Sequence, residues 1–328
     1  MIAVVIPFYQ HQPGLLRQAL LSVAAQDRVR PAEILVVDDG SPISAEQELA
    51  DLPSWLAAMV RILGQPNRGA GAARNRALDA VSPGVKVVAF LDSDDAWSEN
   101  HLANIKAAYE AGAAFYFADH QRAEDPETRF VQCDYRPDGP AVSQASGVEW
   151  CRPDQLMQAI IRRSPVGTST VAISREAIGE QRFPPGFRAA GEDSIFWLGV
   201  LNARPHVACS MGCEAIYGRG VSIFNHRSWG DERVLRTILD EMRAQLFFRA
   251  HFAADDKTAA MIDERCSSLD VGYWRAMIAC ARRGRWQGMA PSALYVTRRP
   301  QALLRLPQAV AQVLCRRTPG QLPGAIAQ

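Results

Sequence analysis

Through the first 120 residues, short and continuous apolar runs alternate with amphipathic segments. Five runs are typical of strands, at residues 2–6, 33–39, 60–63, 85–92 and 113–119, and helical periodicity lies between them at 15–26, 70–81 and 98–111. Because the runs are apolar at almost every position, they predict strands that are covered on both faces. Strands and helices in alternation predict the α/β class, with a mostly parallel, Rossmann-like sheet flanked by helices.

The rest of the chain divides into three parts. Residues 121–165 are rich in Pro and Asp, which predicts a long connection. Apolar runs then return at 169–174, 191–203, 206–211 and 213–218, and two long amphipathic stretches follow at 232–252 and 256–283. We therefore expect one domain over residues 1–228, divided near residue 120, and a helical C-terminal region over residues 229–328.

Composition excludes several classes of protein. The 328 residues carry a net charge of +1, so we expect no nucleic-acid partner. Seven cysteines are an odd and sparse set, which indicates free thiols in a reducing compartment. The N-terminal MIAVVIPFYQ lacks the basic residues of a signal peptide, and no apolar run reaches the roughly 18 residues of a membrane span. These features predict a cytoplasmic protein.

Polar residues follow each of the first four predicted strands. The stretches that contain them are Phe8-Tyr9, Asp38 to Ser41, Asn67 to Gly69, and Asp92 to Asp95. In open α/β sheets, ligands bind beyond the carboxyl ends of the strands. If the four strands are neighbours, these separate stretches converge on one crevice, which makes that crevice the candidate site.

The segment FLDSDDAW places three aspartates within four positions, behind an apolar strand. Asp92 and Asp94 are two residues apart, so both carboxylates can reach one hard cation. Mg²⁺ or Mn²⁺ is typically held by one or two carboxylates and by substrate phosphates, and it would neutralise a diphosphate leaving group. The alternative is a polar turn in which Asp94 or Asp95 caps the following helix.

Other charged residues near the predicted crevice allow two interpretations each. Asp38-Asp39 could accept a hydrogen bond from a uracil N–H, or could belong to a D-G-S turn. Arg74 could bind a diphosphate near a helix start, or could lie on a solvated helix face. Glu192 and Asp193 open a helix, where its dipole stabilises them, yet Asp193 could also act as a general base.

The segment GAGAAR at residues 69–74 superficially matches a dinucleotide-binding fingerprint. Its third glycine position is Arg, it follows the third strand, and no acidic residue closes the next strand at the expected spacing. An NAD enzyme is therefore not expected.

Several motifs together resemble a family 2 glycosyltransferase, a nucleotide-diphospho-sugar transferase with the GT-A fold. The matching motifs are VVIPFYQ (4–10), LLRQALLSVAAQ (15–26), EILVVDDGS (33–41), QPNRGAGAARNRAL (65–78), VVAFLDSDDAW (87–97), VGTSTVAISRE (166–176) and GEDSIFWL (191–198). They occur in the family's order and cover roughly residues 1 to 220.

This resemblance implies roles for individual residues. Asp193 would be the catalytic base, with Glu192 beside it, and Asp94 would be the main metal ligand, with Asp92 contributing. The metal would be Mn²⁺ or Mg²⁺. His226, within the segment 217–230, is a weaker candidate for a flap over the donor. The implied nucleotide-binding residues are Pro7, Tyr9, Asp38, Asp39, Asn67, Arg74, Asp92 and Ser93.

The implied activity is an inverting, metal-dependent transfer of a sugar from a nucleotide-diphospho-sugar, UDP-linked in our interpretation, to a hydroxyl. The acceptor would be a glycan or lipid-linked glycan in surface polysaccharide or glycolipid biosynthesis. Residues 1–120 would bind the nucleotide and 121–228 the acceptor. The alternatives are a nucleotidyltransferase and a non-catalytic binding or scaffold protein on the same fold.

The C-terminal region has a polarised charge. From Val271 to Gln328 there are nine arginines and no Asp, Glu or Lys, and LLRLPQAVAQVLCRR (303–317) has a rough helical period. Such a segment could contact an anionic membrane peripherally, at its inner face. The alternative is a helix that packs on the protein with its arginines solvated.

Overall fold

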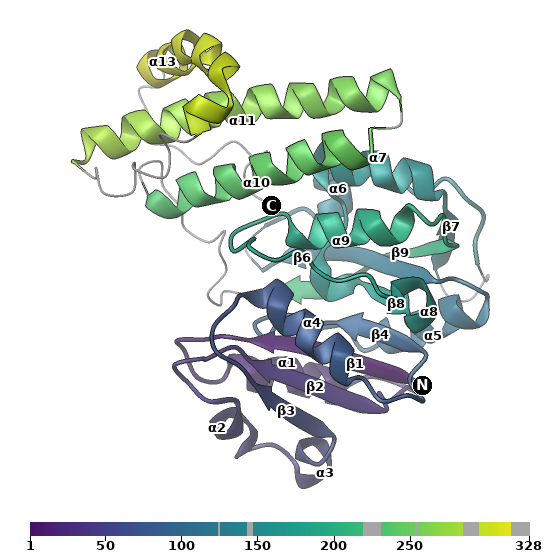
Figure 1. Cartoon of the computed structure of the whole chain (residues 1–328). Coiled ribbons are helices and arrows are strands. Elements are labelled where there is room, and N and C mark those ends of the chain that lie inside the picture. Colours follow the sequence, from purple (N-terminus) through teal and green to yellow (C-terminus); the bar gives the residue numbers. More distant parts are fainter. Residues whose placement is uncertain (124, 143–146, 219–230, 254, 285–294, 316–328) are drawn as a thin grey trace. The chain divides into compact units, whose positions relative to one another are not determined.

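The computed structural model describes residues 1–123, 125–142, 147–218, 231–253, 255–284 and 295–315 (Figure 1). The chain forms two compact units. Unit 1 comprises Met1–Gly186 and Phe196–Ser222, and unit 2 comprises Phe187–Ile195 and Ile223–Gln328. The domain boundary expected between residues 228 and 229 stays a prediction.

Unit 1 contains a mostly parallel sheet of nine strands within the described residues, in the order β3-β2-β1-β4-β8-β6-β9-β5, with β7 paired to β9 (Figure 1). The four strands β3, β2, β1 and β4 are all parallel to one another. The strands are β1 (Ile2–Phe8), β2 (Glu33–Asp38), β3 (Val60–Gly64), β4 (Val87–Phe90), β5 (Ala96–Trp97), β6 (Phe115–Arg122), β7 (Val148–Cys151), β8 (Ala172–Ser174) and β9 (Val207–Tyr217). The predicted α/β class is confirmed. Three strands depart from the parallel order: β8 runs antiparallel to β4 and β6, and β5 and β7 run antiparallel to β9.

Helices connect these strands, and three of them lie where the amphipathic segments 15–26, 70–81 and 98–111 predicted. They are α1 (Leu15–Ala24), α2 (Ala45–Leu49), α3 (Ser54–Ala57), α4 (Ala70–Ala80), α5 (His101–Glu110), α6 (Arg129–Cys133), α7 (Pro153–Arg163), α8 (Arg175–Ile178) and α9 (Glu192–Leu201), with a 3₁₀ turn at Thr168–Thr170. The start of α2 has a complete capping box, in which Ser44 and Gln47 each bond the other's backbone N–H. Local chemistry therefore sets this helix start.

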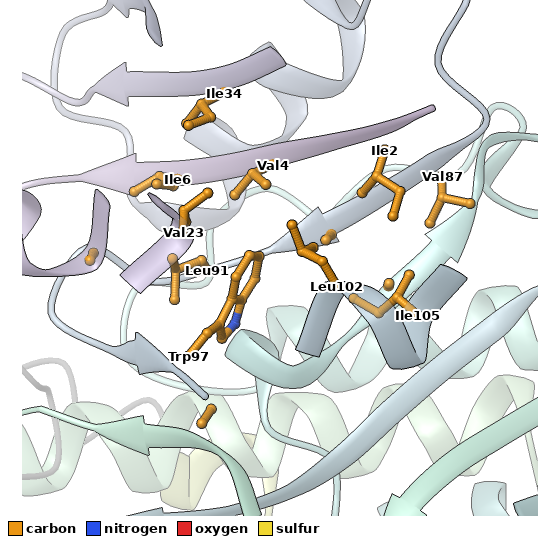
Figure 2. Packing of buried hydrophobic residues seen from close by; sticks show 14 of the residues in the cluster. Ile2, Val4, Ile6, Val23, Ile34, Val87, Leu91, Trp97, Leu102 and Ile105 are labelled. Carbon is orange, nitrogen blue, oxygen red and sulfur yellow. The ribbon is translucent and has the colours of Figure 1, made fainter. Parts of the chain in front are cut away.

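The first face of the sheet packs against α1 and α5. Ile2, Val4 and Ile6 alternate along β1 toward this face, and Figure 2 shows them beside Leu102 and Trp97. Each of these five side chains is less than a tenth exposed. Full burial of such a side chain stabilises the fold by about 1.5–3 kcal/mol. This packed layer therefore holds in place the strands whose carboxyl ends carry the candidate site.

The second face of the sheet is covered by α4 and by an aromatic cluster. Phe90 of β4 contacts Phe183, Phe196 and Trp197, and all four rings are nearly inaccessible to solvent. The rings of Phe183 and Phe196 stack with centroids 4.1 Å apart. Both faces of the central strands are therefore buried, which explains why their sequences are continuous apolar runs.

Two expectations for the middle of the chain were wrong. The expected connection 121–165 contains α6, β7 and the eleven-residue α7. Helix α7 begins with Pro153, a position at which the missing N–H removes no helical hydrogen bond, so proline there does not indicate a loop. The two runs at 206–211 and 213–218 form the single strand β9, which has register irregularities opposite Ala118 to His120. Met211 and Gly212 have no partner in the register with β6, and they form a bulge within the strand.

Unit 2 is built on two long helices, α10 (Glu232–His251) and α11 (Asp256–Arg282), at the positions that the amphipathic stretches predicted. The later segments are a 3₁₀ helix, η3 (Pro300–Arg305), and α13 (Leu306–Cys315). They are anchored to α11, because Asp270 accepts hydrogen bonds from Tyr295 and Arg299, and Trp274 donates to the carbonyl of Ala302. Arg299 is therefore an internal ion-pair partner and not a solvated arginine.

Across the described ranges, we find no helix that combines the length and the apolar character needed to span a bilayer.

Candidate active site

The carboxyl ends of β1, β2 and β4 meet at one edge of the sheet and are tied together by Gln10. Its backbone N–H donates to Ser41 Oγ at 2.9 Å, and Ser41 Oγ donates to the Gln10 carbonyl at 3.1 Å. The Gln10 side chain donates to Ser93 Oγ at 3.0 Å. Gln10 is only 3% exposed, so it acts as an internal brace across three strand ends. Nothing in the sequence distinguished it from a surface glutamine.

Asp38 and Asp39 hold the loops around this edge. Asp38 accepts from the backbone N–H groups of Ser41 and Ala45, which closes the turn into α2. Asp39 is buried and accepts from the Gln65 side chain at 2.7 Å and from two backbone N–H groups, those of Arg68 and Gly69, at 2.8 Å each. A carboxylate has about four acceptor positions, so these three donors leave room at Asp39 for one more, such as a nucleobase N–H.

Arg74 lies in the interior, at the side of Asp92. Its Nη2 is 2.6 Å from Asp92 Oδ1, its side chain is 4% exposed, and its guanidinium sits over the Phe183 ring at 5.4 Å. The alternative of a solvated helix face is therefore wrong for Arg74. The half-exposed Asp92 carboxylate is held by a fixed cation, which orients it at the strand end.

Asp95 joins the aspartate loop to two distant segments. Its Oδ2 accepts from Ser169 Oγ at 2.5 Å, and its Oδ1 accepts from the Gly218 N–H at 2.9 Å. Ser169 Oγ in turn accepts from the Asp92 N–H at 3.0 Å. Burial, and then the charges of Asp94 and Asp92, raise the pKa of Asp95 well above its usual range. Helix capping by Asp94 or Asp95 was wrong, because β5 follows directly and α5 begins only at His101.

Gly218 and Trp97 complete this set of contacts, which we call the Asp95 clamp (Asp95, Trp97, Ser169 and Gly218). A Cβ at Gly218 would lie 1.8 Å from the Asp94 carbonyl oxygen, so only glycine allows the end of β9 to approach the loop. Trp97 Nε1 donates to the Ser169 carbonyl at 2.5 Å. These contacts fix three segments around the half-buried Asp94: the aspartate loop with β5, the 3₁₀ turn that contains Ser169, and the end of β9.

The residues at this edge fit a divalent cation that a substrate helps to bind. No group of three or more His, Cys, Asp or Glu side chains that could hold a metal occurs in the part of the chain that the structure describes. Asp92 and Asp94 offer two carboxylates, and Mg²⁺ or Mn²⁺ commonly takes one or two carboxylates with phosphate oxygens and water. The donor set therefore suits a cation held jointly with a diphosphate, not a cage made by protein alone.

The remaining predicted residues fall in three places. Pro7 is buried in β1 opposite Val37, and the half-buried ring of Tyr9 meets His11 edge-on at 5.4 Å. Asn67 is exposed on the loop before α4, and the buried Ser93 accepts the Gln10 hydrogen bond. His226 lies outside the described residues.

The two residues predicted as catalytic, the base Asp193 and its neighbour Glu192, belong to unit 2. Glu192 and Asp193 form the first turn of α9, and Asp193 Oδ1 accepts from the Ser194 N–H at 2.6 Å. The structure therefore gathers Asp39, Arg74, Asp92 and Asp94 within unit 1, whereas the role of Asp193 stays a prediction.

His120 is a buried histidine beside the Asp95 clamp. Its ring packs against Tyr217 with centroids 4.4 Å apart, and its Nδ1 has no hydrogen-bond partner among the described residues. Burial, followed by the charges of Arg129 and Arg122, lowers the pKa of His120 to about 3. The folded protein therefore favours the neutral imidazole.

We expect acid to destabilise the protein through His120. The contribution of neutral His120 to the free energy of unfolding is fully present above the unfolded-state pKa of about 6.5, and it is lost as the pH falls toward the folded-state pKa. Between pH 8 and pH 5 the expected loss is about 2 kcal/mol. Urea unfolding at the two pH values should show this loss in wild type and a smaller one in His120→Phe. His11→Phe, a change at an exposed histidine, should follow wild type. Equal pH dependence in wild type and His120→Phe would contradict the assignment.

Solved structures with this fold support the sheet assignment. The 1–349 region of S. aureus TarS in complex with UDP-GlcNAc superposes with a TM-score of 0.51 at 17% identity, covering 84% of this chain and 81% of that chain. The mannosyltransferase PcManGT from Pyrobaculum calidifontis, in complex with GDP-Man and Mn²⁺, superposes with a TM-score of 0.54 at 15% identity, covering 97% and 88%. At these identities the likeness shows the GT-A fold.

Sequence comparison identifies the family. The chain is 32% identical over 240 residues to the succinoglycan biosynthesis protein ExoW of Rhizobium meliloti (strain 1021), covering 68% of this chain and 70% of that protein. Residues 3–164 match the model of glycosyl transferase family 2. This segment contains the strand ends, the aspartate loop and Arg74, and the resemblance first drawn from the motifs is confirmed: the chain is a glycosyltransferase that belongs to glycosyl transferase family 2.

Proposed function

We propose that the chain is an inverting, metal-dependent glycosyltransferase that moves a sugar from a UDP-sugar to an acceptor hydroxyl. One observation carries this proposal. Asp39, Asp92 and Asp94 converge at the carboxyl ends of parallel strands, and Arg74 is buried against Asp92. That edge offers an acceptor for a nucleobase and two carboxylates for a cation that would neutralise a diphosphate, and Arg74 holds one of these carboxylates in place.

Two structural neighbours support the choice of donor class. TarS is described in complex with UDP-GlcNAc, and PcManGT with GDP-Man and Mn²⁺. Both ligands are nucleotide-diphospho-sugars, and the second structure also contains a divalent metal. We choose UDP over GDP because one remaining acceptor position on Asp39 suits the single ring N–H of uracil.

In the proposed mechanism, Asp94 and Asp92 would hold the cation with the donor diphosphate. The cation, when bound, neutralises charge on the departing diphosphate. Arg74 keeps the Asp92 carboxylate oriented, and Asp39 holds the base against the loop before α4. Asp193 takes the proton of the attacking hydroxyl, so that a single displacement inverts the configuration at the sugar carbon. Glu192 beside it contacts a sugar hydroxyl.

The acceptor class is drawn from ExoW, a succinoglycan biosynthesis protein. By analogy, the acceptor would be a growing surface glycan or its lipid-linked precursor, met at the inner face of a membrane. Exposed Leu303, Leu304 and Leu314 beside the exposed Arg305 support peripheral contact with an anionic surface through η3 and α13.

A thermal-shift panel tests the donor and metal together. UDP, GDP, dTDP, CMP and NAD are each added with and without Mn²⁺ to wild type, to Asp94→Ala and to Asp51→Ala. A ligand at 100 times its Kd stabilises the native state by about 2.7 kcal/mol, which a melting curve detects readily. We expect a Mn²⁺-dependent shift with UDP that is lost in Asp94→Ala and retained in the control, because Asp51 is an exposed partner of Arg17.

Other outcomes would contradict parts of the proposal. A larger shift with GDP would replace the UDP assignment and leave the metal site intact. A UDP shift that is indifferent to both Mn²⁺ and Asp94 would exclude the metal-dependent mechanism.

A further inference from the structure

A cavity lies at the edge of the sheet opposite the candidate active site. It has a volume of about 500 Å³, and its walls include Trp150, Arg152, Asp154, Arg204, Pro205 and His206. These residues come from the end of β7, the start of α7 and the segment leading into β9. Because β8 runs antiparallel to both β4 and β6, and β9 runs parallel to β6, the start of β9 is at the edge away from Asp92. Its size is within the range of small-ligand sites.

The positive charges of this cavity differ in how they are held. Arg152 is anchored by Asp138, whose two oxygens accept from its Nε at 2.6 Å and from its backbone N–H at 3.2 Å. Arg204 pairs with no acidic side chain anywhere in the described ranges. Its backbone has a φ of +53°, a strained conformation for a residue with a side chain. Arg152 is thus held by an acidic partner, whereas the exposed Arg204 has no acidic partner among the described residues.

The apolar part of the cavity is an aromatic and proline wall. The Trp150 ring meets His206 edge-on, with centroids 6.0 Å apart, and Pro153 and Pro205 lie nearby in the lining. An indole face with adjacent cations suits a ring that can place C–H groups against the indole and that carries an anionic group.

The start of α7 argues against a phosphate as that anionic group. Helix N-termini bind phosphate through exposed backbone N–H groups, but the first residue here is Pro153, which has none. The next residue is Asp154, whose carboxylate repels a dianion and accepts hydrogen bonds from hydroxyl groups. A ligand with one carboxylate and several hydroxyls matches this set better than a nucleotide does.

We propose that this cavity binds an acidic sugar residue of a glycan. Its carboxylate lies between Arg152 and Arg204, its ring lies on Trp150, and its hydroxyls donate to Asp154. The site is separate from the proposed donor site, and binding there needs neither nucleotide nor metal. It would hold a part of a glycan that is remote from the reacting end.

Calorimetric titration with an oligogalacturonate trimer, without nucleotide or Mn²⁺, tests this site. The neutral galactose trimer and UMP serve as comparison ligands. We expect the acidic trimer to bind and Arg204→Gln to weaken it at least about tenfold, because a charge-assisted hydrogen bond is lost. Arg204→Lys keeps the charge and should retain part of the affinity. Arg28→Gln is the matched control, because Arg28 is also exposed with a positive φ and is paired with Asp27.

Three results would overturn the proposal: no binding of the acidic trimer, equal binding of the neutral trimer, or an affinity that Arg204→Gln leaves unchanged. Tighter binding of UMP, sensitive to Arg204, would identify a nucleotide site instead. Because the assay contains no donor and no metal, none of these results depends on the proposed transferase mechanism.

Discussion

Asp193→Asn is expected to lower kcat about 10²- to 10⁴-fold with little change in the KM for the donor. A positioned general base contributes a rate factor of this size, and the amide cannot accept the proton of the acceptor hydroxyl. The substitution keeps an oxygen for the Ser194 N–H, so the first turn of α9 retains its hydrogen bond. Steady-state kinetics with the nucleotide sugar identified by the thermal-shift panel would measure both constants.

A matched control separates catalysis from helix stability. Asp256 lies in the first turn of α11, as Asp193 does in α9, and both carboxylates interact favourably with a helix dipole. Asp256→Asn should therefore cost a similar fraction of a kcal/mol in stability and leave kcat unchanged. A normal kcat in Asp193→Asn, or an equal loss in both variants, would remove Asp193 from the mechanism.

The parallel half of the sheet was predictable because its signal is local. Each run such as residues 2–6 is apolar at successive positions, and a helical segment follows three of the five runs, so class and order follow from neighbouring residues. The antiparallel insertion of β8 between β4 and β6 was not predictable. A three-residue strand carries almost no periodic pattern, and its partners are chosen by tertiary packing.

Some residues of the candidate site could likewise be predicted from local sequence, and others could not. Asp39, Arg74, Asp92 and Asp94 could be proposed because each lies just after a strand or at the start of a helix. The Asp95 clamp could not be proposed from the sequence. Asp95 is separated along the chain from Ser169 by 74 positions and from Gly218 by 123 positions. Ser169 and Gly218 have no local sequence feature that marks them as partners of an aspartate loop.

Asp95→Ala should lower the free energy of unfolding by about 2–4 kcal/mol. It leaves the Gly218 N–H and the Ser169 hydroxyl without their buried acceptor, and each such loss costs about 1–3 kcal/mol. Asp95→Asn keeps an oxygen for Gly218 and places an amide at Ser169 Oγ, so we expect a loss below about 1 kcal/mol. Urea unfolding at pH 7 would measure both.

The same variants distinguish a positioning role from a merely structural one. Glu214 is an equally buried carboxylate that accepts from Tyr116 and Asn104, outside the aspartate loop, and Glu214→Ala should also destabilise the protein by a few kcal/mol. If the Asp95 clamp positions Asp94, only Asp95→Ala should weaken the Mn²⁺-dependent nucleotide shift, and Asp95→Asn should restore most of it. If Asp95 and Glu214 variants lose stability alike and bind the nucleotide alike, the clamp holds the fold together without orienting the metal-binding loop.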